Sequence, residues 1–303
     1  METLKEGFVP CEYVSELDAL NLDIREIQPV LKIGKGRFFE VWEGQWCGAT
    51  RTRVVIKKMT EQFTSTLNIK DELATMKSLY HPNLVRFYGA FTRKEPICLI
   101  MELLECGTLL NYLHGDGRRL QLPQLLQKAT QVAAGMAYLE QQNYVHQSLS
   151  ARNVMLTKDL VCKVTDHGVV RLLEEVHEEC SIPIFLPKWT APEALLHGNF
   201  TTKSDVWSFG IVLYEIVTYG NSPYIGMSNT QVIKEVQEGY RIPCPEHCQE
   251  KLYNIMLSCW NKEFQNRPTF ETLKWQMDDY FTIDQEGYLY MSYKKKSTVN
   301  LTA

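Results

Sequence analysis

The sequence lacks any apolar run long enough to cross a bilayer. Such a span requires about 18 apolar residues, and the two most apolar stretches, residues 97–104 and 211–217, are shorter. The opening Met1-Glu2-Thr3-Leu4 has neither the charged-then-apolar layout of a signal peptide nor the Met-Gly start needed for N-myristoylation. We therefore expect no transmembrane segment and no myristoylation signal, which makes the cytoplasm the default location.

The sequence also lacks a basic excess and a disulfide framework. Its 32 Lys+Arg against 36 Asp+Glu give a net charge of −4, whereas general binders of nucleic acid or anionic membranes carry a basic surplus. The 9 cysteines are scattered and odd in number, so reduced thiols are expected. Cys244 and Cys248 flank His247, but no second group of ligands lies nearby in sequence, which disfavours a metal site.

What is present is an ordinary globular composition, 45% hydrophobic and 22% charged, arranged in two halves. Strand-forming residues over 29–58, a helical segment over 66–79 and strand-like runs over 84–91 and 97–103 predict a small sheet-rich lobe. From residue 108 onward helices dominate. The expected helices cover residues 122–141, 204–218, 230–238, 250–259 and 269–280.

Five sequence blocks carry the strongest signal. They are YVHQSLSARNV at 144–154, KVTDHG at 163–168, KWTAPE at 188–193, SDVWSFG at 204–210 and the Arg-Pro pair at 267–268. In this order and at this spacing they resemble a Src-like non-receptor protein tyrosine kinase. The pattern is closest to the Fyn-related branch, with substitutions typical of pseudokinases.

The resemblance implies an α+β, bilobal protein-kinase fold. It places a β-rich N-lobe at 27–104 and a helical C-lobe at 105–281, after an extension at 1–26 and before a polar tail at 282–303. It further implies ATP and Mg²⁺ as cofactors. The implied partners are protein substrates or signalling partners of tyrosine kinases, with no nucleic acid.

Residue roles follow from the same resemblance. Gly34 and Gly36 would cover the ATP phosphates, and Lys57, oriented by Glu72, would hold the α- and β-phosphates. The expected nucleotide-binding set is Gly34, Gly36, Val41, Val55, Lys57, Glu72, Met101, Glu102 and Leu104, of which Glu102 to Leu104 would form the adenine hinge.

In the larger lobe, the resemblance assigns Asn153 and Asp166 to Mg²⁺. The positions of the catalytic loop are Ser148, Arg152 and Asn153, with Ser148 at the place of the catalytic aspartate. Glu193 and Arg267 would form a structural ion pair.

Ser148 is the departure with the greatest consequence. The family aspartate accepts the proton of the substrate hydroxyl, and a neutral serine hydroxyl is a poor base near pH 7. Positioned acid–base catalysis contributes about 10²–10⁴-fold, which corresponds to about 3–5 kcal/mol of barrier. We therefore predict a pseudokinase or a very slow kinase. Two alternatives stay open: an active tyrosine kinase in which a nearby carboxylate or water substitutes, and a kinase-like domain that folds poorly.

Gln147 is linked to this change. The family has an arginine here that pairs with a phosphotyrosine of the activation segment. This sequence has no tyrosine between Asp166 and Glu193. Both the arginine that would bind the phosphate and the tyrosine that would carry it are therefore absent. The four glutamates of that segment are expected in a solvated acidic loop; they are Glu174, Glu175, Glu178 and Glu179.

Three further departures touch the nucleotide site. Phe39 replaces the third loop glycine, and Val55 replaces the alanine above adenine, at an overpacking cost of about 1–3 kcal/mol. His167 replaces a phenylalanine beside Asp166. It would join a spine with Met76, Phe87 and His146, in which two imidazoles cannot both be protonated cheaply. Weakened but retained nucleotide binding is the expectation.

Overall fold

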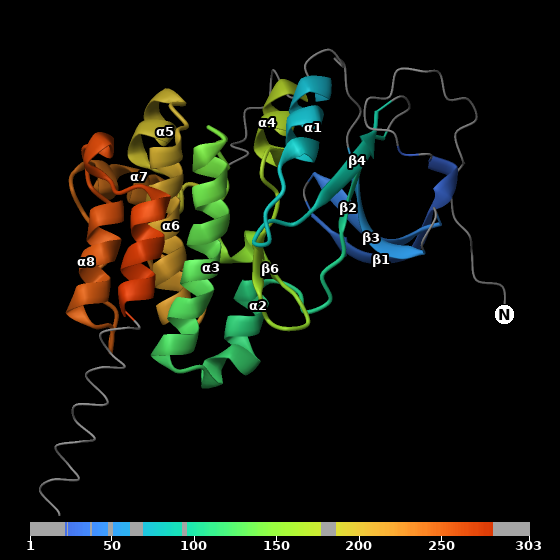
Figure 1. The fold of residues 1–303 in the computed structure, drawn as a ribbon. Coiled ribbons are helices and arrows are strands. Elements are labelled where there is room, and N and C mark those ends of the chain that lie inside the picture. The colour runs from blue at the N-terminus through green and yellow to red at the C-terminus, as the bar shows by residue number, and fades with distance from the viewer. Residues whose placement is uncertain are drawn as a thin grey trace, which may run out of the picture. The chain divides into compact units, whose positions relative to one another are not determined.

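The structure, a computed structural model, describes residues 22, 24–36, 38–47, 51–60, 69–92, 96–176 and 186–280. The described residues form two compact units (Figure 1). Unit 1 contains the described residues up to Tyr80, Leu84–Glu105 and the described part of Gly168–Ile184; unit 2 contains the rest. The break between Glu105 and Cys106 is adjacent to the lobe boundary expected from the sequence. Most of the expected extension and all of the expected tail lie outside the described residues.

Unit 1 is built on a five-stranded antiparallel sheet with the order β1-β2-β3-β5-β4. The predicted meander over residues 29–58 and the two later strands are confirmed, the latter slightly shorter than expected. The strands are β1 (Ile27–Lys35), β2 (Phe39–Trp46), β3 (Thr52–Met59), β4 (Phe87–Phe91) and β5 (Cys98–Glu102), and a short 3-10 turn, Ile24–Glu26, precedes them.

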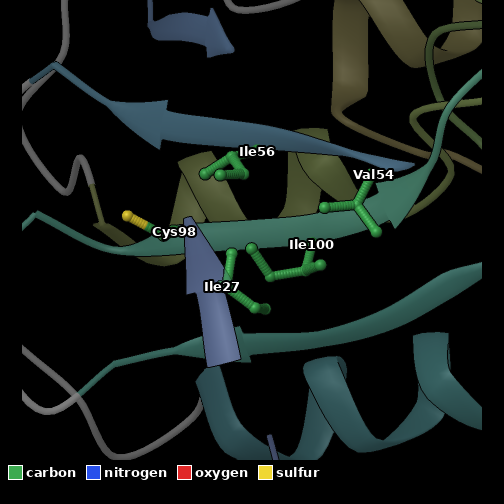
Figure 2. Packing of buried hydrophobic residues seen from close by; sticks show 5 residues of the cluster. All are labelled: Ile27, Val54, Ile56, Cys98 and Ile100. Carbon is green, nitrogen blue, oxygen red and sulfur yellow. The ribbon is translucent and has the colours of Figure 1, made fainter. Parts of the chain in front are cut away.

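The sheet has one face packed as a core. A buried cluster gathers there (Figure 2), made of Ile27, Val54, Ile56, Cys98 and Ile100. Because side chains alternate along a strand, the residues between these on β3 and β5 point to the opposite face. That second face therefore carries Val55 and Lys57 from β3, and Leu99 and Met101 from β5.

Two helices complete unit 1. Helix α1 (Ile69–Ser78) buries Ile69, Leu73 and Met76, at steps of four and three residues. Helix α4 (Val169–Val176) lies beside it (Figure 1). Glu174 and Glu175 lie in α4, so the prediction of a loop is wrong at these two positions. The apolar run at the start of α4 explains why: Val169, Val170, Leu172 and Leu173 are all buried. Glu178 and Glu179 lie outside the described residues.

Unit 2 is helical and centres on α6 (Thr202–Val217), which is buried from Ser204 to Ile216 and packs on α3 and α8. The predicted helices at 122–141 and 250–259 are confirmed at both ends, and those at 204–218 and 230–238 to within a residue or two. The other helices are α2 (Leu109–His114), α3 (Leu122–Gln141), α5 (Pro192–His197), α7 (Asn229–Gln237), α8 (Glu250–Cys259) and a helix over 270–280.

Unit 2 also contains a small hairpin, β6 (Val154–Leu156) with β7 (Cys162–Val164), and 3-10 turns at Asp116–Arg119, Ala151–Asn153 and Phe264–Asn266. Segments this short have no readable periodicity, so sequence analysis did not find them. The β-rich unit and the helical unit confirm the α+β class. Within the described residues, no helix has the length and apolar character needed to cross a membrane.

Candidate active site

The β6–β7 hairpin brings together the two residues expected to bind metal. Asn153 directly precedes β6, and Asp166 follows β7 by two residues. The ladder pairs Val154 with Val164 and is extended by the Thr165 N–H, which donates to the Asn153 carbonyl at 2.9 Å. The backbone thus holds Asn153 and Asp166 at one end of the hairpin.

The donor set at this end suits Mg²⁺. The Asn153 Nδ2 donates to the Ser148 carbonyl at 2.7 Å, so the amide offers its oxygen. Asp166 adopts a left-handed backbone, φ 63°, and its Oδ1 accepts from the Thr165 hydroxyl at 3.3 Å. Mg²⁺ takes one or two carboxylates and fills its octahedron with water and phosphate oxygens, so two oxygen donors suffice. Among the described residues, no group of three or more His, Cys, Asp or Glu side chains converges.

Helix α6 fixes the start of the catalytic loop through a buried carboxylate. Asp205, 1% exposed, accepts from the backbone N–H groups of His146 at 2.7 Å and Gln147 at 2.9 Å. Gln147 has φ 69°, a left-handed conformation uncommon outside glycine. The two charge-assisted bonds stabilise this strained turn. Asp205 was noted in sequence only as part of a motif.

A second α6 carboxylate, Glu215, was missed in sequence analysis. One of its oxygens accepts from the Ala151 N–H at 2.8 Å and from the Trp189 indole at 3.0 Å, and Arg152 lies 5.3 Å over the Trp189 ring. Burial raises the pKa of Glu215 to about 7, against the lowering effect of these bonds and of Arg152. A signal was available: Glu215 is the one charged residue in the apolar stretch 211–217.

Ser148 lies among neutral nitrogen groups of its own loop. Its hydroxyl is 3.4 Å from His146 Nδ1 and 3.5 Å from Asn153 Nδ2. His146 is fully buried, and its Nε2 donates to the Thr165 carbonyl at 2.9 Å while its Nδ1 accepts from the Ser148 N–H at 3.2 Å. Burial lowers the pKa of His146 to about 4, so the ring is neutral at pH 7. His167 makes an edge contact with Tyr144, with the ring centroids 6.3 Å apart.

In unit 1, the nucleotide-facing residues predicted from sequence share one face of the sheet. Gly34 pairs with Val41, and Val41 pairs with Lys57 across β1, β2 and β3. Residues opposite each other in a sheet point to the same side, so these positions form one row. Val55 and Met101, both buried, face each other on β3 and β5. The residue that replaces the expected alanine is therefore buried next to Met101.

The loop glycines are not required by packing within the protein. A Cβ on Gly34 would lie 3.7 Å from the Val41 Cβ, and one on Gly36 would lie 3.6 Å from the Phe39 carbonyl, both ordinary contacts. At Gly44, in contrast, a Cβ would lie 2.5 Å from Ile56 Cδ1. The turn is closed by the Gly36 N–H, which donates to the Phe39 carbonyl at 2.7 Å. Glycine at 34 and 36 therefore fits a backbone that a ligand approaches closely.

Three further predicted residues lie in unit 1. Glu72 lies in the first turn of α1. Glu102 Oε2 accepts from the Arg86 N–H at 3.0 Å, and Leu104 is buried. The pairing of Lys57 with Glu72 and the spine of Met76, Phe87, His146 and His167 remain predictions.

The predicted ion pair of the larger lobe is confirmed. Arg267 donates to both oxygens of Glu193, at 2.6 and 2.9 Å, and its side chain is fully buried. It also donates to the carbonyls of Asn261 and Lys203, at 3.0 and 2.9 Å. Every guanidinium nitrogen is therefore engaged.

Comparison with known families identifies this arrangement. The family model described as "Protein tyrosine and serine/threonine kinase" matches residues 27–277. The chain belongs to the protein kinase family, and its β-rich and helical units are those of the bilobal kinase fold.

Among named relatives, the chain is similar to tyrosine kinases. It is 45% identical to tyrosine-protein kinase SRK3 of Spongilla lacustris over 90% of this chain and 82% of that protein. Identity to SRK2 of the same organism is 46%, over 86% of this chain and 71% of the relative. Identity to human tyrosine-protein kinase FRK is 44%, over 88% of this chain but only 54% of the relative. The chain thus spans about half the length of FRK.

Proposed function

We propose that this chain is a Src-like tyrosine-kinase domain that binds ATP and Mg²⁺ but transfers the γ-phosphoryl group to protein tyrosine very slowly or not at all. It signals as a pseudokinase in the cytoplasm, by engaging protein substrates or partners of active tyrosine kinases. The observation that carries the proposal is Ser148, at the position that the resemblance assigns to the catalytic carboxylate; its hydroxyl lies 3.4 Å from His146 Nδ1 and 3.5 Å from Asn153 Nδ2, both neutral groups.

The loop supplies no replacement base at this point. Proton acceptance needs a group whose pKa approaches the working pH. A serine hydroxyl does not meet this condition, and His146, the ring beside it, has a pKa lowered to about 4. The Nδ1 lone pair of His146 also already accepts the Ser148 N–H. Residues 144–154 therefore offer the substrate hydroxyl no carboxylate of their own.

Nucleotide binding has more support. Gly34 and Gly36 leave the backbone open to phosphate, and Lys57 supplies a cation on the same sheet face as Val41. In unit 2, Asn153 and Asp166 would hold Mg²⁺, whose charge neutralises the phosphates when it is bound. Val55 and Phe39 add bulk compared with the family pattern, so we infer weaker affinity than in an active kinase.

The second candidate function is an active tyrosine kinase. It is favoured by the names of the relatives, all tyrosine-protein kinases, and by the intact anchoring of the loop on Asp205 and Glu215. In this reading a water or another carboxylate serves as base.

Replacing Ser148 with aspartate separates these functions. The expected result is a gain of at least about 100-fold in phosphotransfer to a tyrosine-containing peptide with Mg-ATP, since positioned acid–base catalysis contributes about 10²–10⁴-fold. Ser148→Asn is the matched control, because asparagine has the shape of aspartate without its negative charge. This variant should give no gain in phosphotransfer. A natural chain as fast as Ser148→Asp would overturn the pseudokinase proposal. If both are silent, the impairment lies at Phe39, Val55 or His167, or in an activation segment that phosphorylation does not switch.

Binding of ATP is tested independently of turnover. Mg-ATP at 100 times its Kd should stabilise the folded chain by about 2.7 kcal/mol, measured by thermal melting. Asp166→Asn should abolish most of this stabilisation while leaving the melting temperature without ligand nearly unchanged. A chain that melts cooperatively but shows no ligand shift would contradict the nucleotide-binding proposal, and the absence of a cooperative transition would support the reading as a poorly folding product.

A further inference from the structure

Outside the kinase site, two cysteines of unit 2 meet in one tight loop. Cys244 is exposed and Cys248 half-buried, and they enclose the turn just before α8. The turn is closed by the Cys248 N–H, which donates to the Pro245 carbonyl at 3.0 Å, and by a left-handed His247 with φ 63°. This geometry folds the five-residue segment back on itself.

The two cysteines lie close together within this loop. Cys244 Sγ lies 3.7 Å from the Cys248 carbonyl oxygen, so the first sulfur already reaches the residue that carries the second. Burial, followed by the adjacent Cys244, raises the pKa of Cys248 to about 12. Of the other described cysteines, Cys98, Cys162 and Cys259 are buried, Cys47 is half-buried and Cys106 is exposed.

We propose that Cys244 and Cys248 are a redox-modification site, at which a hydroperoxide converts the two thiols into a disulfide within the loop. Cys244, the more exposed sulfur, attacks a peroxide oxygen as thiolate, which breaks the O–O bond, gives a sulfenic acid and releases hydroxide. The Cys248 sulfur then displaces hydroxide from the Cys244 sulfur and forms the S–S bond. In balance, two thiols and one hydrogen peroxide give one disulfide and two waters.

The geometry favours this second step over further oxidation of Cys244. A disulfide requires sulfurs about 2 Å apart and a small Cα separation. Cys244 Sγ already reaches the main chain of Cys248, and Cys248 Sγ lies 3.7 Å from the Gln249 carbonyl oxygen, so rotation of the two side chains within the tight loop brings the sulfurs together. The neighbours of the turn do not obstruct it, because the side chains of Glu246 and His247 are 89% and 90% exposed. The inference is independent of the proposed kinase activity.

Peptide mapping of the full chain tests the proposal. Both cysteines fall in one tryptic peptide, residues 242–251, between Arg241 and Lys251. After brief treatment with hydrogen peroxide and alkylation under denaturing conditions, this peptide should be unalkylated and lighter by two hydrogen atoms. Dithiothreitol should restore double alkylation. Cys106 is exposed but is not part of the proposed pair. It should still be alkylated after peroxide treatment and serves as the internal control.

Serine substitutions test whether both cysteines are required for the mass loss. Cys244→Ser and Cys248→Ser should each abolish the mass loss, whereas Cys106→Ser should leave it unchanged. Full alkylation of both cysteines after peroxide would overturn the proposal. So would a sulfinic acid on Cys244 with Cys248 still free, or a disulfide joining either residue to a different cysteine.

Discussion

Replacing Arg267 with leucine is expected to lower the free energy of unfolding by about 3–5 kcal/mol, because breaking a buried ion pair leaves an uncompensated charge. Arg267 is 2% exposed and donates to both oxygens of Glu193 and to two backbone carbonyls. Leucine would fill part of the volume but leave these acceptors without donors. Since a domain has only about 5–15 kcal/mol of stability, the variant would lie close to unfolding.

Urea denaturation of the natural chain and Arg267→Leu measures this effect. The matched control is Arg53→Leu, because Arg53 also pairs with two glutamates, Glu43 and Glu105, but has a side chain 54% exposed. Exposed pairs contribute about 0–1 kcal/mol, so the control should differ little from the natural chain. Equal losses in the two variants would show that burial of the Glu193 pair is not what makes it important.

Replacing Glu215 with glutamine is expected to remove a pH dependence of stability. The pKa of Glu215 is raised from 4.5 to about 7 in the fold. An acid with a raised pKa favours the folded state while it is protonated, so this contribution is lost as the pH rises from about 4.5 to about 7. A shift of this size corresponds to about 3 kcal/mol. Glutamine stays neutral and can still accept from Ala151 and Trp189.

The measurement compares unfolding free energies of the natural chain and Glu215→Gln at pH 5 and pH 8. The variant should gain stability relative to the natural chain between the two values, by up to about 3 kcal/mol. His114 and Arg152 are the charged or titratable groups that act on this carboxylate, and both are unchanged in the variant. Glu238→Gln, at a side chain 61% exposed, should track the natural chain. A constant difference across the pH range would contradict the assignment.

The sequence predicted long elements well and short ones poorly. Helices α3 and α8 were bounded correctly because their apolar spacing runs over several turns. Helix α4 was not predicted, because a segment of eight residues with two glutamates is too short to show a clear helical pattern. Its helix is recognised only from the packing against α1. The same holds for β6 and β7, whose three-residue strands exist only through pairing with each other.

The site was predicted unevenly for a related reason. Side chains that carry a family motif, such as Asn153 and Asp166, could be found from order and spacing. Glu215 could not be found from order and spacing, although it is the one charged residue of an apolar stretch. Its carboxylate accepts from the backbone N–H of Ala151, 64 residues earlier, at 2.8 Å. Tertiary structure decides which main-chain N–H groups need an acceptor. The residues that accept from them therefore follow no fixed spacing in the sequence.

The way α6 holds the loop around Ser148 determines what a substitution at that position can change. Asp205 accepts hydrogen bonds from the backbone N–H groups of His146 and Gln147, and Glu215 accepts one from that of Ala151. The side chain of Ser148 takes no part in these three anchoring hydrogen bonds. A substitution at position 148 leaves all three anchors in place, so the catalytic carboxylate that we propose is missing can be restored without a change in the way α6 holds the loop.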